Sequence, residues 1–188
     1  MRRLHLPLLR LPLLLGPLLV AGAASPAALA ASLQLNIELP AQQVSEYHRP
    51  YVAVWIERPD RSVAADLAAW YQVRDGKDAQ TGKSEPGSKW LTELRQWWRR
   101  SGREQSLPID GVSAATRPAG RHQLSLSSDR APLAGLASGS YRLVIEVVRE
   151  VGGREILSLP FSWPPAAQEH LSARGEREIG AVKLDLAP

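Results

Sequence analysis

The sequence of 188 residues contains no cysteine, one methionine and one phenylalanine. Without cysteine there can be no disulfide, thiolate metal site, cysteine nucleophile, cysteine-ligated iron–sulfur cluster or lipid-bearing cysteine anchor. Any chemistry must therefore come from hydroxyls, carboxylates, the four histidines or a bound cofactor. Hydrophobic residues make up 44% of the chain and charged residues 22%, which is typical of a globular protein and not of a disordered one.

The first thirty residues contain no acidic side chain and have the layout of a secretory signal peptide. Arg2 and Arg3 precede an apolar run over residues 4–20, and small residues then lead to an Ala-Leu-Ala cleavage signal at 28–30. A transmembrane helix is the alternative interpretation. Arg10 and several prolines interrupt the run, however, so its continuous length is well below the ~20 residues of a membrane span.

Most of the excess positive charge lies in this leader. The whole chain has 23 Lys and Arg against 19 Asp and Glu, and three of the arginines fall within residues 1–30. The remaining chain is nearly neutral, which leaves no electrostatic argument for nucleic-acid binding. We predict a signal peptide over residues 1–30, a periplasmic location, one domain over residues 31–188, and no membrane span after cleavage.

Short segments with alternating or β-branched apolar residues predict strands. Residues 32–39 alternate with a period of two, and residues 51–57 form a more buried segment between two prolines. Residues 140–163 predict a β-hairpin in which Gly152 and Gly153 both adopt positive φ. Residues 74–89 and 106–119 are predicted loops. The remaining predicted strands are 67–73, 123–126, 170–174 and 179–186.

One segment, residues 89–100, has helical periodicity. Its large apolar residues fall on one stripe: Trp90, Leu91, Leu94, Trp97 and Trp98. We predict one long helix here, capped by Ser88 and ended by Gly102. Seven or eight short strands with one inserted helix and no βαβ alternation favour an all-β fold, an immunoglobulin-like antiparallel β-sandwich.

The patterns of common enzyme classes are missing. His48, His122 and His170 lie at no metal-binding spacing, and no nucleophile elbow or phosphate-binding glycine loop occurs. The tryptophans could form a platform for a ring ligand or could pack the helix onto the sheet. Trp98 is the one expected off the core side, because it cannot point the same way as Trp97.

One heptapeptide points to a modification. Residues 110–116, Asp-Gly-Val-Ser-Ala-Ala-Thr, resemble the acceptor motif of flavin transferases: Asp, two variable residues, Ser or Thr, Gly, Ala, then Thr or Ser. The resemblance implies that Thr116 accepts flavin mononucleotide (FMN) through a phosphoester bond, within a motif formed by Asp110, Ser113, Ala114 and Ala115. A hydroxyl is a suitable nucleophile toward phosphorus. Glycine is usual at Ala114, and alanine costs on the order of 1 kcal/mol if that position needs positive φ.

A wider resemblance covers nearly the whole chain after the leader. Five segments are similar to a family of predicted periplasmic proteins known as a domain of unknown function (number 2271): residues 47–57, 89–100, 116–120, 141–153 and 178–182. The resemblance implies a periplasmic protein with a β-sandwich fold. It also implies that the gene lies, as genes of the family often do, near genes for flavin transferases and for PepSY-type membrane proteins, which look like transmembrane reductases. The resemblance identifies no catalytic residue in this sequence.

Two hypotheses of different classes follow. In the first, the protein is an electron carrier and not an enzyme in its own right. Covalent FMN is attached at Thr116 by a flavin transferase, a PepSY-type membrane reductase is the redox partner, and Trp98 lies near the cofactor. In the second, the protein is a non-redox periplasmic binding or assembly module that holds a membrane partner through its loops or an edge strand.

Overall fold

A computed structural model describes residues 30–77 and 82–188. The predicted signal peptide, except its last residue, lies outside the described residues. Within them, no helix has both the length and the apolar character that crossing a membrane requires.

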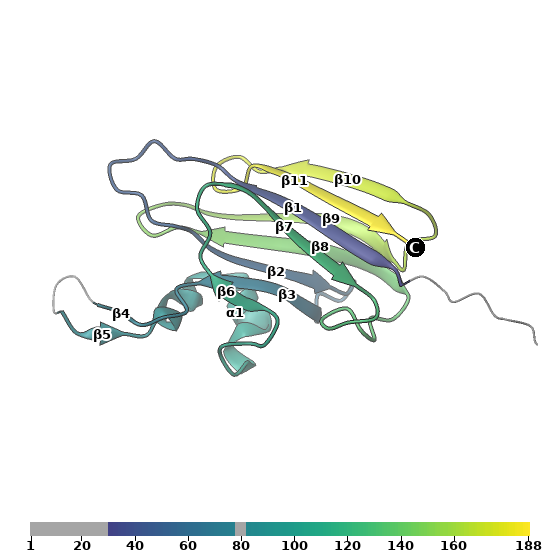
Figure 1. Cartoon of the computed structure of the whole chain (residues 1–188), viewed down its shortest axis with the longest axis horizontal. Helices are drawn as coiled ribbons and strands as arrows, with labels where there is room; N and C mark the ends of the chain where they lie inside the picture. The colour runs from purple at the N-terminus through teal and green to yellow at the C-terminus, as the bar shows by residue number, and fades with distance from the viewer. Residues whose placement is uncertain (1–29, 78–81) are drawn as a thin grey trace, which may run out of the picture.

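Strands dominate the described chain, and they form two large sheets and one small one (Figure 1). The first has four strands in the order β10-β11-β1-β7, and the second has five in the order β6-β3-β2-β8-β9. The strands are β1 (Ser32–Leu39), β2 (Tyr51–Glu57), β3 (Val63–Tyr71), β4 (Gly76–Lys77), β5 (Ser84–Glu85), β6 (Ser113–Ala115), β7 (Gly120–Ser127), β8 (Gly139–Val148), β9 (Arg154–Trp163), β10 (Glu169–Arg174) and β11 (Ala181–Ala187). β4 and β5 form the small sheet, a hairpin that projects from one end of the molecule.

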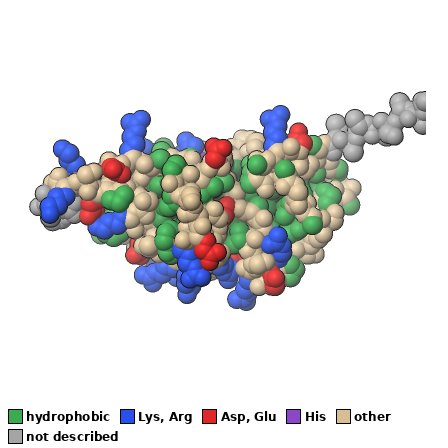
Figure 2. Space-filling model, turned by 90° about the horizontal axis from the view of Figure 1, so that it is seen from below, with side chains coloured by type: hydrophobic (Ala, Val, Ile, Leu, Met, Phe, Trp, Pro, Cys, Tyr) green, Lys and Arg blue, Asp and Glu red, His purple; other side chains and the backbone are tan. Residues whose placement is uncertain are grey.

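A helical segment covers the outer face of the five-stranded sheet, the face seen from below in Figure 2. It consists of the 3₁₀ helix η1 (Gly87–Glu93), the short α-helix α1 (Arg95–Arg100) and the 3₁₀ turn η2 (Gly102–Glu104). Leu91, Leu94 and Trp97 are fully buried against Trp55 of β2 and its neighbours. Figure 2 shows Lys and Arg side chains interspersed with Asp and Glu on this face.

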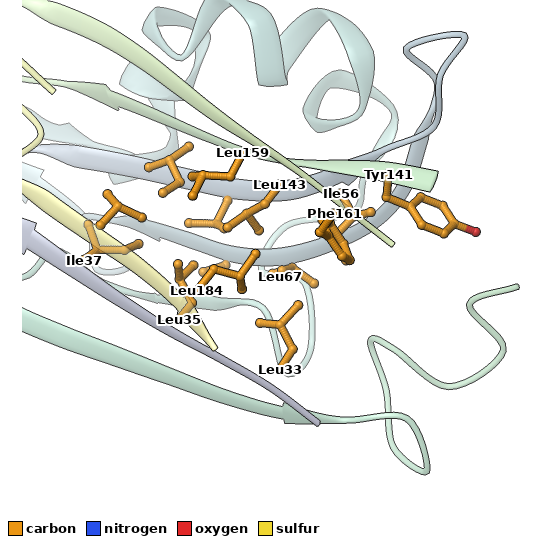
Figure 3. Packing of buried hydrophobic residues seen from close by; sticks show 14 of the residues in the cluster. Leu33, Leu35, Ile37, Ile56, Leu67, Tyr141, Leu143, Leu159, Phe161 and Leu184 are labelled. Carbon is orange, nitrogen blue, oxygen red and sulfur yellow. The ribbon is translucent and has the colours of Figure 1, made fainter. Parts of the chain in front are cut away.

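The main core lies between the two large sheets (Figure 3). Leu33, Leu35 and Ile37 of β1 point inward at every second residue and are at most 1% exposed. They meet the inner residues of β2 and β8, such as Ile56 and Leu143. The period of two in the sequence therefore places one face of each strand in this core, as the strand geometry requires.

The all-β prediction is confirmed, and β1 and β2 have the predicted bounds. The immunoglobulin-like assignment stays a prediction. The third strand was placed too late: β3 begins at Val63, where the chain pairs with β2 through two register shifts that a periodicity count does not reveal. The predicted loops also hold regular structure, because β4, β5 and β6 each pair with another segment.

The prediction of one long helix is wrong. Leu94 has ψ of +67°, which interrupts the helical backbone between η1 and α1. Ser88 makes no cap, since the residue preceding η1 is Pro86. The predicted stripe is also divided: Trp97 is buried, Trp98 is half-buried and Trp90 is 47% exposed.

The β8–β9 hairpin is confirmed, but the predicted role of its glycines is wrong. The residue with positive φ in the turn is Val151, at +53°, and neither Gly152 nor Gly153 has it. Glycine is favoured at these two positions because neighbouring atoms leave little room for a side chain. A Cβ at Gly152 would lie 2.6 Å from Cζ of Arg149, and one at Gly153 would lie 3.0 Å from Oε1 of Glu178.

Candidate functional site

Strand directions bring distant residues together at one end of the five-stranded sheet. β2 is antiparallel to β3 and β8, and β6 is parallel to β3. The start of β2 at Tyr51 therefore meets the ends of β3, β6 and β8 and the start of β9 at Arg154. In Figure 1 this is the end toward which the β8 arrow points, opposite the C-terminus.

A pocket of about 560 Å³ occupies this end. Pockets that bind small molecules measure roughly 300–1,000 Å³. Its walls come from the loop before β2, the end of β3, the helical segment, the residue after β6 and the β8–β9 turn. The lining residues are His48, Arg49, Tyr51, Gln72, Trp90, Glu93, Arg95, Thr116 and residues 148–154.

Two aromatic side chains form part of the wall. The hydroxyl of Tyr51 donates a hydrogen bond of 2.9 Å to the carbonyl of Gly87, which ties β2 to the start of η1. Burial raises the pKa of Tyr51, so this phenol stays protonated at neutral pH. Trp90 is half exposed, and Nζ of Lys89 lies 4.9 Å from the centre of its ring. The wall therefore offers one fixed ring and one accessible ring.

Arg149 is the most buried charged group of the lining. Its Nε and Nη2 donate to the two carboxylate oxygens of Glu178 at 3.0 and 3.1 Å, and both side chains are about 6% exposed or less. Nη1 is buried and has no hydrogen-bond partner among the described residues. A buried donor without an acceptor costs about 1–3 kcal/mol, so Nη1 retains an unused capacity to donate hydrogen bonds.

The loop that supplies Glu178 is fixed by a second carboxylate. Glu155, on β9, accepts hydrogen bonds from the backbone N–H groups of residues 176–179 at 2.5–3.1 Å. Burial acts to raise the pKa of Glu155, but these four N–H donors outweigh it and the pKa is lowered. Glu155 therefore stays ionised and holds Glu178 in position beside Arg149.

A third carboxylate, Glu146 of β8, positions the helical wall. Glu146 is fully buried and accepts hydrogen bonds from the backbone N–H groups of Gln96 and Trp97, the latter at 2.8 Å. It also pairs with Arg154 at 3.1 Å. It thus replaces the N-cap side chain that α1 lacks and orients an arginine of the pocket.

The mouth of the pocket carries further charges of both signs. His48 lies between Glu46, 3.1 Å from Nε2, and Glu150, 3.4 Å from Nδ1. Arg95 lies 3.6 Å from Glu93. In total, four arginines and two glutamates line the pocket, and two of these arginines, Arg149 and Arg154, pair with the buried carboxylates of Glu178 and Glu146.

Of the predicted acceptor motif, Thr116 reaches this pocket. Its backbone N–H donates to the carbonyl of Tyr71 at 3.1 Å, which fixes the residue beyond the end of β6. The motif was predicted to lie in a loop, and this is wrong for its centre. Residues 113–115 form β6, an edge strand, because they pair in parallel with β3.

The other motif residues, 110–115, are not part of the lining of this pocket. Asp110 is exposed, and Gly111 has φ of +69° in the turn before β6. Oγ of Ser113 accepts a hydrogen bond of 2.9 Å from the N–H of Ile109, which closes that turn. Ala114 lies in the extended strand without positive φ, so the strain considered for alanine there does not arise; Ala115 is exposed.

Trp98 lines a different hollow. This depression of about 380 Å³ is formed by Thr92, Arg95, Trp98, Arg99 and Arg154, and Thr116 is not part of it. The two hollows share Arg95 and Arg154. The aromatic residues that line the pocket of Thr116 are Tyr51 and Trp90, and Trp90 belongs to η1 whereas Trp98 belongs to α1.

Sequence reasoning missed the groups that form the site around Thr116. Arg149, Glu178 and Glu146 are charged residues within or beside strands, where period-two counting assigns them to solvent. The one sequence feature that could have indicated them is Gly152-Gly153, which pack against Arg149 and Glu178. From the sequence, this pair indicates only a turn preference. Among residues 30–77 and 82–188, no group of three or more His, Asp or Glu could hold a metal ion.

Comparison with known proteins yields one match. The family model described as "Predicted periplasmic protein (DUF2271)" matches residues 32–181. No curated protein and no solved structure matches the chain.

Proposed function

The chain belongs to DUF2271, a family of predicted periplasmic proteins, and from this membership and the pocket we propose that it is a periplasmic electron carrier with FMN esterified to Thr116. A flavin transferase attaches the cofactor, and a PepSY-type membrane reductase is the redox partner. The family description gives the periplasmic location directly, whereas the cofactor, the attachment and the partners are the proposal.

The observation that carries the proposal is the position of Thr116. The residue that the motif singles out as acceptor lies half-buried at a pocket of about 560 Å³ that also contains Tyr51 and Trp90. Such a pocket has room for a planar ring system, and aromatic side chains pack well against one. A threonine in an ordinary surface loop would have none of these neighbours.

The arginines that line the pocket also fit the phosphate group of FMN. A phosphodiester between Thr116 and FMN carries one negative charge, and Arg49, Arg95, Arg149 and Arg154 line the same pocket. The unpartnered Nη1 of Arg149 supplies a donor that nothing else among the described residues uses. Arginine is well suited to phosphate because of its charge and its planar set of donors.

The attachment is a phosphoryl transfer. Oγ1 of Thr116 attacks the phosphorus of the FMN half of a flavin dinucleotide, the phosphoanhydride bond breaks and AMP leaves. The proton of the hydroxyl passes to a base of the transferase. The edge position of β6 leaves the acceptor accessible from outside the sheet, which the second protein requires.

The chain's own residues bind and orient the group. Arg149, fixed by Glu178, would hold the phosphate group, and Tyr51 and Trp90 would pack against the ring system. When bound, flavin supplies reversible electron transfer. A covalent bond retains the flavin outside the cytoplasm, where a dissociated cofactor would diffuse away.

Intact mass spectrometry tests the proposal. The chain is exported from cells that contain a flavin transferase, and its mass should increase by that of one FMN less one water. Thr116→Ser should keep the increase because it retains the hydroxyl, and Thr116→Ala should lose it. Thr92→Ala, an exposed threonine of η1, is the matched control and should keep it. An unshifted mass in the unsubstituted chain, or a shift that persists in Thr116→Ala, refutes the proposal.

The alternative, a non-redox binding or assembly module, gives a different result in the same preparation. A colourless protein without in-gel flavin fluorescence, isolated together with a membrane partner, would replace the electron-carrier proposal with this one. A yellow protein whose fluorescence survives denaturation excludes it.

A further inference from the structure

We propose that Arg149 is the phosphate subsite of the pocket and binds, without any covalent bond, the phosphate of a phosphomonoester that also carries an aromatic ring system. The proposal rests on the proposed function for the identity of the ester, FMN. It goes further in assigning a reversible binding site, and a residue, to which the acceptor motif makes no reference.

The hydrogen bonds of Arg149 are the first argument. Its side chain is 6% exposed, and two of its three nitrogens are engaged by Glu178. The third, Nη1, is buried and has no partner among the described residues, and Arg149 is one of the residues that line the pocket. A guanidinium has donors on all three nitrogens, so this arginine is fixed in place with donors still available.

The surrounding structure holds the guanidinium rigidly. Gly152 lies so close that a Cβ there would be 2.6 Å from Cζ and 2.7 Å from Nη2. Gly153 donates its N–H to Oε1 of Glu178 at 2.8 Å. Glu155 in turn fixes the loop that carries Glu178. A donor fixed from two sides in this way loses little freedom on binding a ligand, which favours affinity.

The charges and rings of the pocket select the class of ligand. The carboxylate of Glu178 already neutralises Arg149, so the attraction for an anion comes from Nη1 together with the exposed guanidinium groups of Arg49 and Arg95. Several donors in one pocket suit the oxygens of a phosphate. Tyr51 and Trp90 add rings on which an aromatic group can pack, so a phosphomonoester that carries an aromatic ring system uses both parts of the site.

The test uses the full exported chain with Thr116→Ala, which cannot be esterified at that position. FMN, riboflavin and inorganic phosphate are titrated separately, with flavin fluorescence for the first two and calorimetry for phosphate. FMN should bind at least about tenfold more tightly than riboflavin, and inorganic phosphate should compete with FMN. Equal affinity for FMN and riboflavin, or no binding of either, overturns the subsite.

A double variant assigns the effect to Arg149. Arg149→Gln with Glu178→Gln removes both charges of the buried pair together, so that no uncompensated charge is left inside the protein. It should abolish the preference for FMN over riboflavin. Arg130→Gln, an exposed arginine in the connection between β7 and β8, is the matched control and should keep that preference. Melting curves confirm that each variant is folded.

These outcomes separate the two proposals. If the chain with Thr116 is esterified but the Thr116→Ala form shows no preference for FMN, the proposed function stands and the subsite is wrong. If FMN binds reversibly but Thr116 is never esterified, the subsite stands and the covalent attachment is wrong.

Discussion

The two faces of the five-stranded sheet are stabilised in different ways. The inner face contributes buried hydrophobic side chains, such as Val54 and Ile145, to the core between the sheets. The outer face alternates with it along the same strands and adds Glu57 and Glu146, which are 2% and 0% exposed. The comparison shows that the burial of these two side chains depends on polar partners, because a carboxyl group without them is costly to bury.

The outer carboxylates all connect the sheet to the helical segment or to arginines. Glu57 pairs with Arg100 at the end of α1 and lies 3.5 Å from Arg142. Asp66 accepts a hydrogen bond of 2.8 Å from Nε1 of Trp97. The inner face thus stabilises the sandwich, and the outer face orients the segment that carries the pocket wall.

The largest effect is expected on the inner face. Ile145→Ala, at a fully buried position, should lower the free energy of unfolding by about 4 kcal/mol, because the loss of side-chain burial adds to the cavity left behind. Urea titration monitored by tryptophan fluorescence measures it. Ile145→Val should cost about 1 kcal/mol. A loss for alanine no larger than for valine would show that this face is loosely packed.

The neighbouring residue tests the outer face. Glu146→Ala should cost about 3 kcal/mol, because the N–H groups of Gln96 and Trp97 lose their acceptor and Arg154 loses its partner. Near-ultraviolet circular dichroism should also change as α1 shifts.

Glu146→Gln is the control for this change, since its amide oxygen still accepts one of these hydrogen bonds, and it should cost less. If alanine and glutamine cost the same, the carboxylate does not position α1 in the way described.

Gly102 tests how tightly the helical segment packs on the outer face, without involving a polar partner. A Cβ there would lie 2.6 Å from Cζ3 of Trp97, a fully buried ring whose Nε1 is bonded to Asp66. Gly102→Ala should therefore cost about 2 kcal/mol in thermal or urea unfolding. Gly139→Ala, where the nearest atom to a Cβ is 3.7 Å away, should change stability by less than about 0.5 kcal/mol. Equal effects at both positions would contradict the close contact.

The smallest effect concerns Glu155 and depends on pH. Its pKa in the folded state is lowered from the ordinary value of 4.5, so its contribution is fully present above that value and is lost as pH falls through the folded-state pKa. Between about pH 5 and about pH 3 the unsubstituted chain should therefore lose more stability than Glu155→Gln. Urea midpoints across this range provide the measurement, and parallel curves for the two proteins would contradict the assignment.

The sequence predicted the parts of the fold that depend on local pattern. Alternation in residues 32–39 and the β-branched run of residues 51–57 correspond to β1 and β2 with the expected bounds. The continuous helix over residues 89–100 failed, because the backbone turns at Leu94 and a distant carboxylate, Glu146, begins a new helix. Periodicity alone contains no information about that contact.

The candidate site was also predicted only in part from the sequence. A heptapeptide pattern was enough to single out Thr116, because the motif is contiguous in the chain. Trp98 was selected by its neighbour relation to Trp97, and the structure instead brings Trp90 to the pocket of Thr116. Which tryptophan faces which hollow depends on the break between η1 and α1, which the sequence pattern did not predict.

The sequence by itself determined which side chains of β1 enter the core, because the side-chain period of a strand is a local property of the backbone. Only the tertiary structure decided what surrounds Thr116. Arg149 and Glu178 are 29 residues apart, and they meet because the register of β8 and β9 and the four N–H bonds to Glu155 fix the loop between β10 and β11 beside the β8–β9 turn. Contacts of this kind arise from strand pairing across the whole chain, and no local pattern contains them.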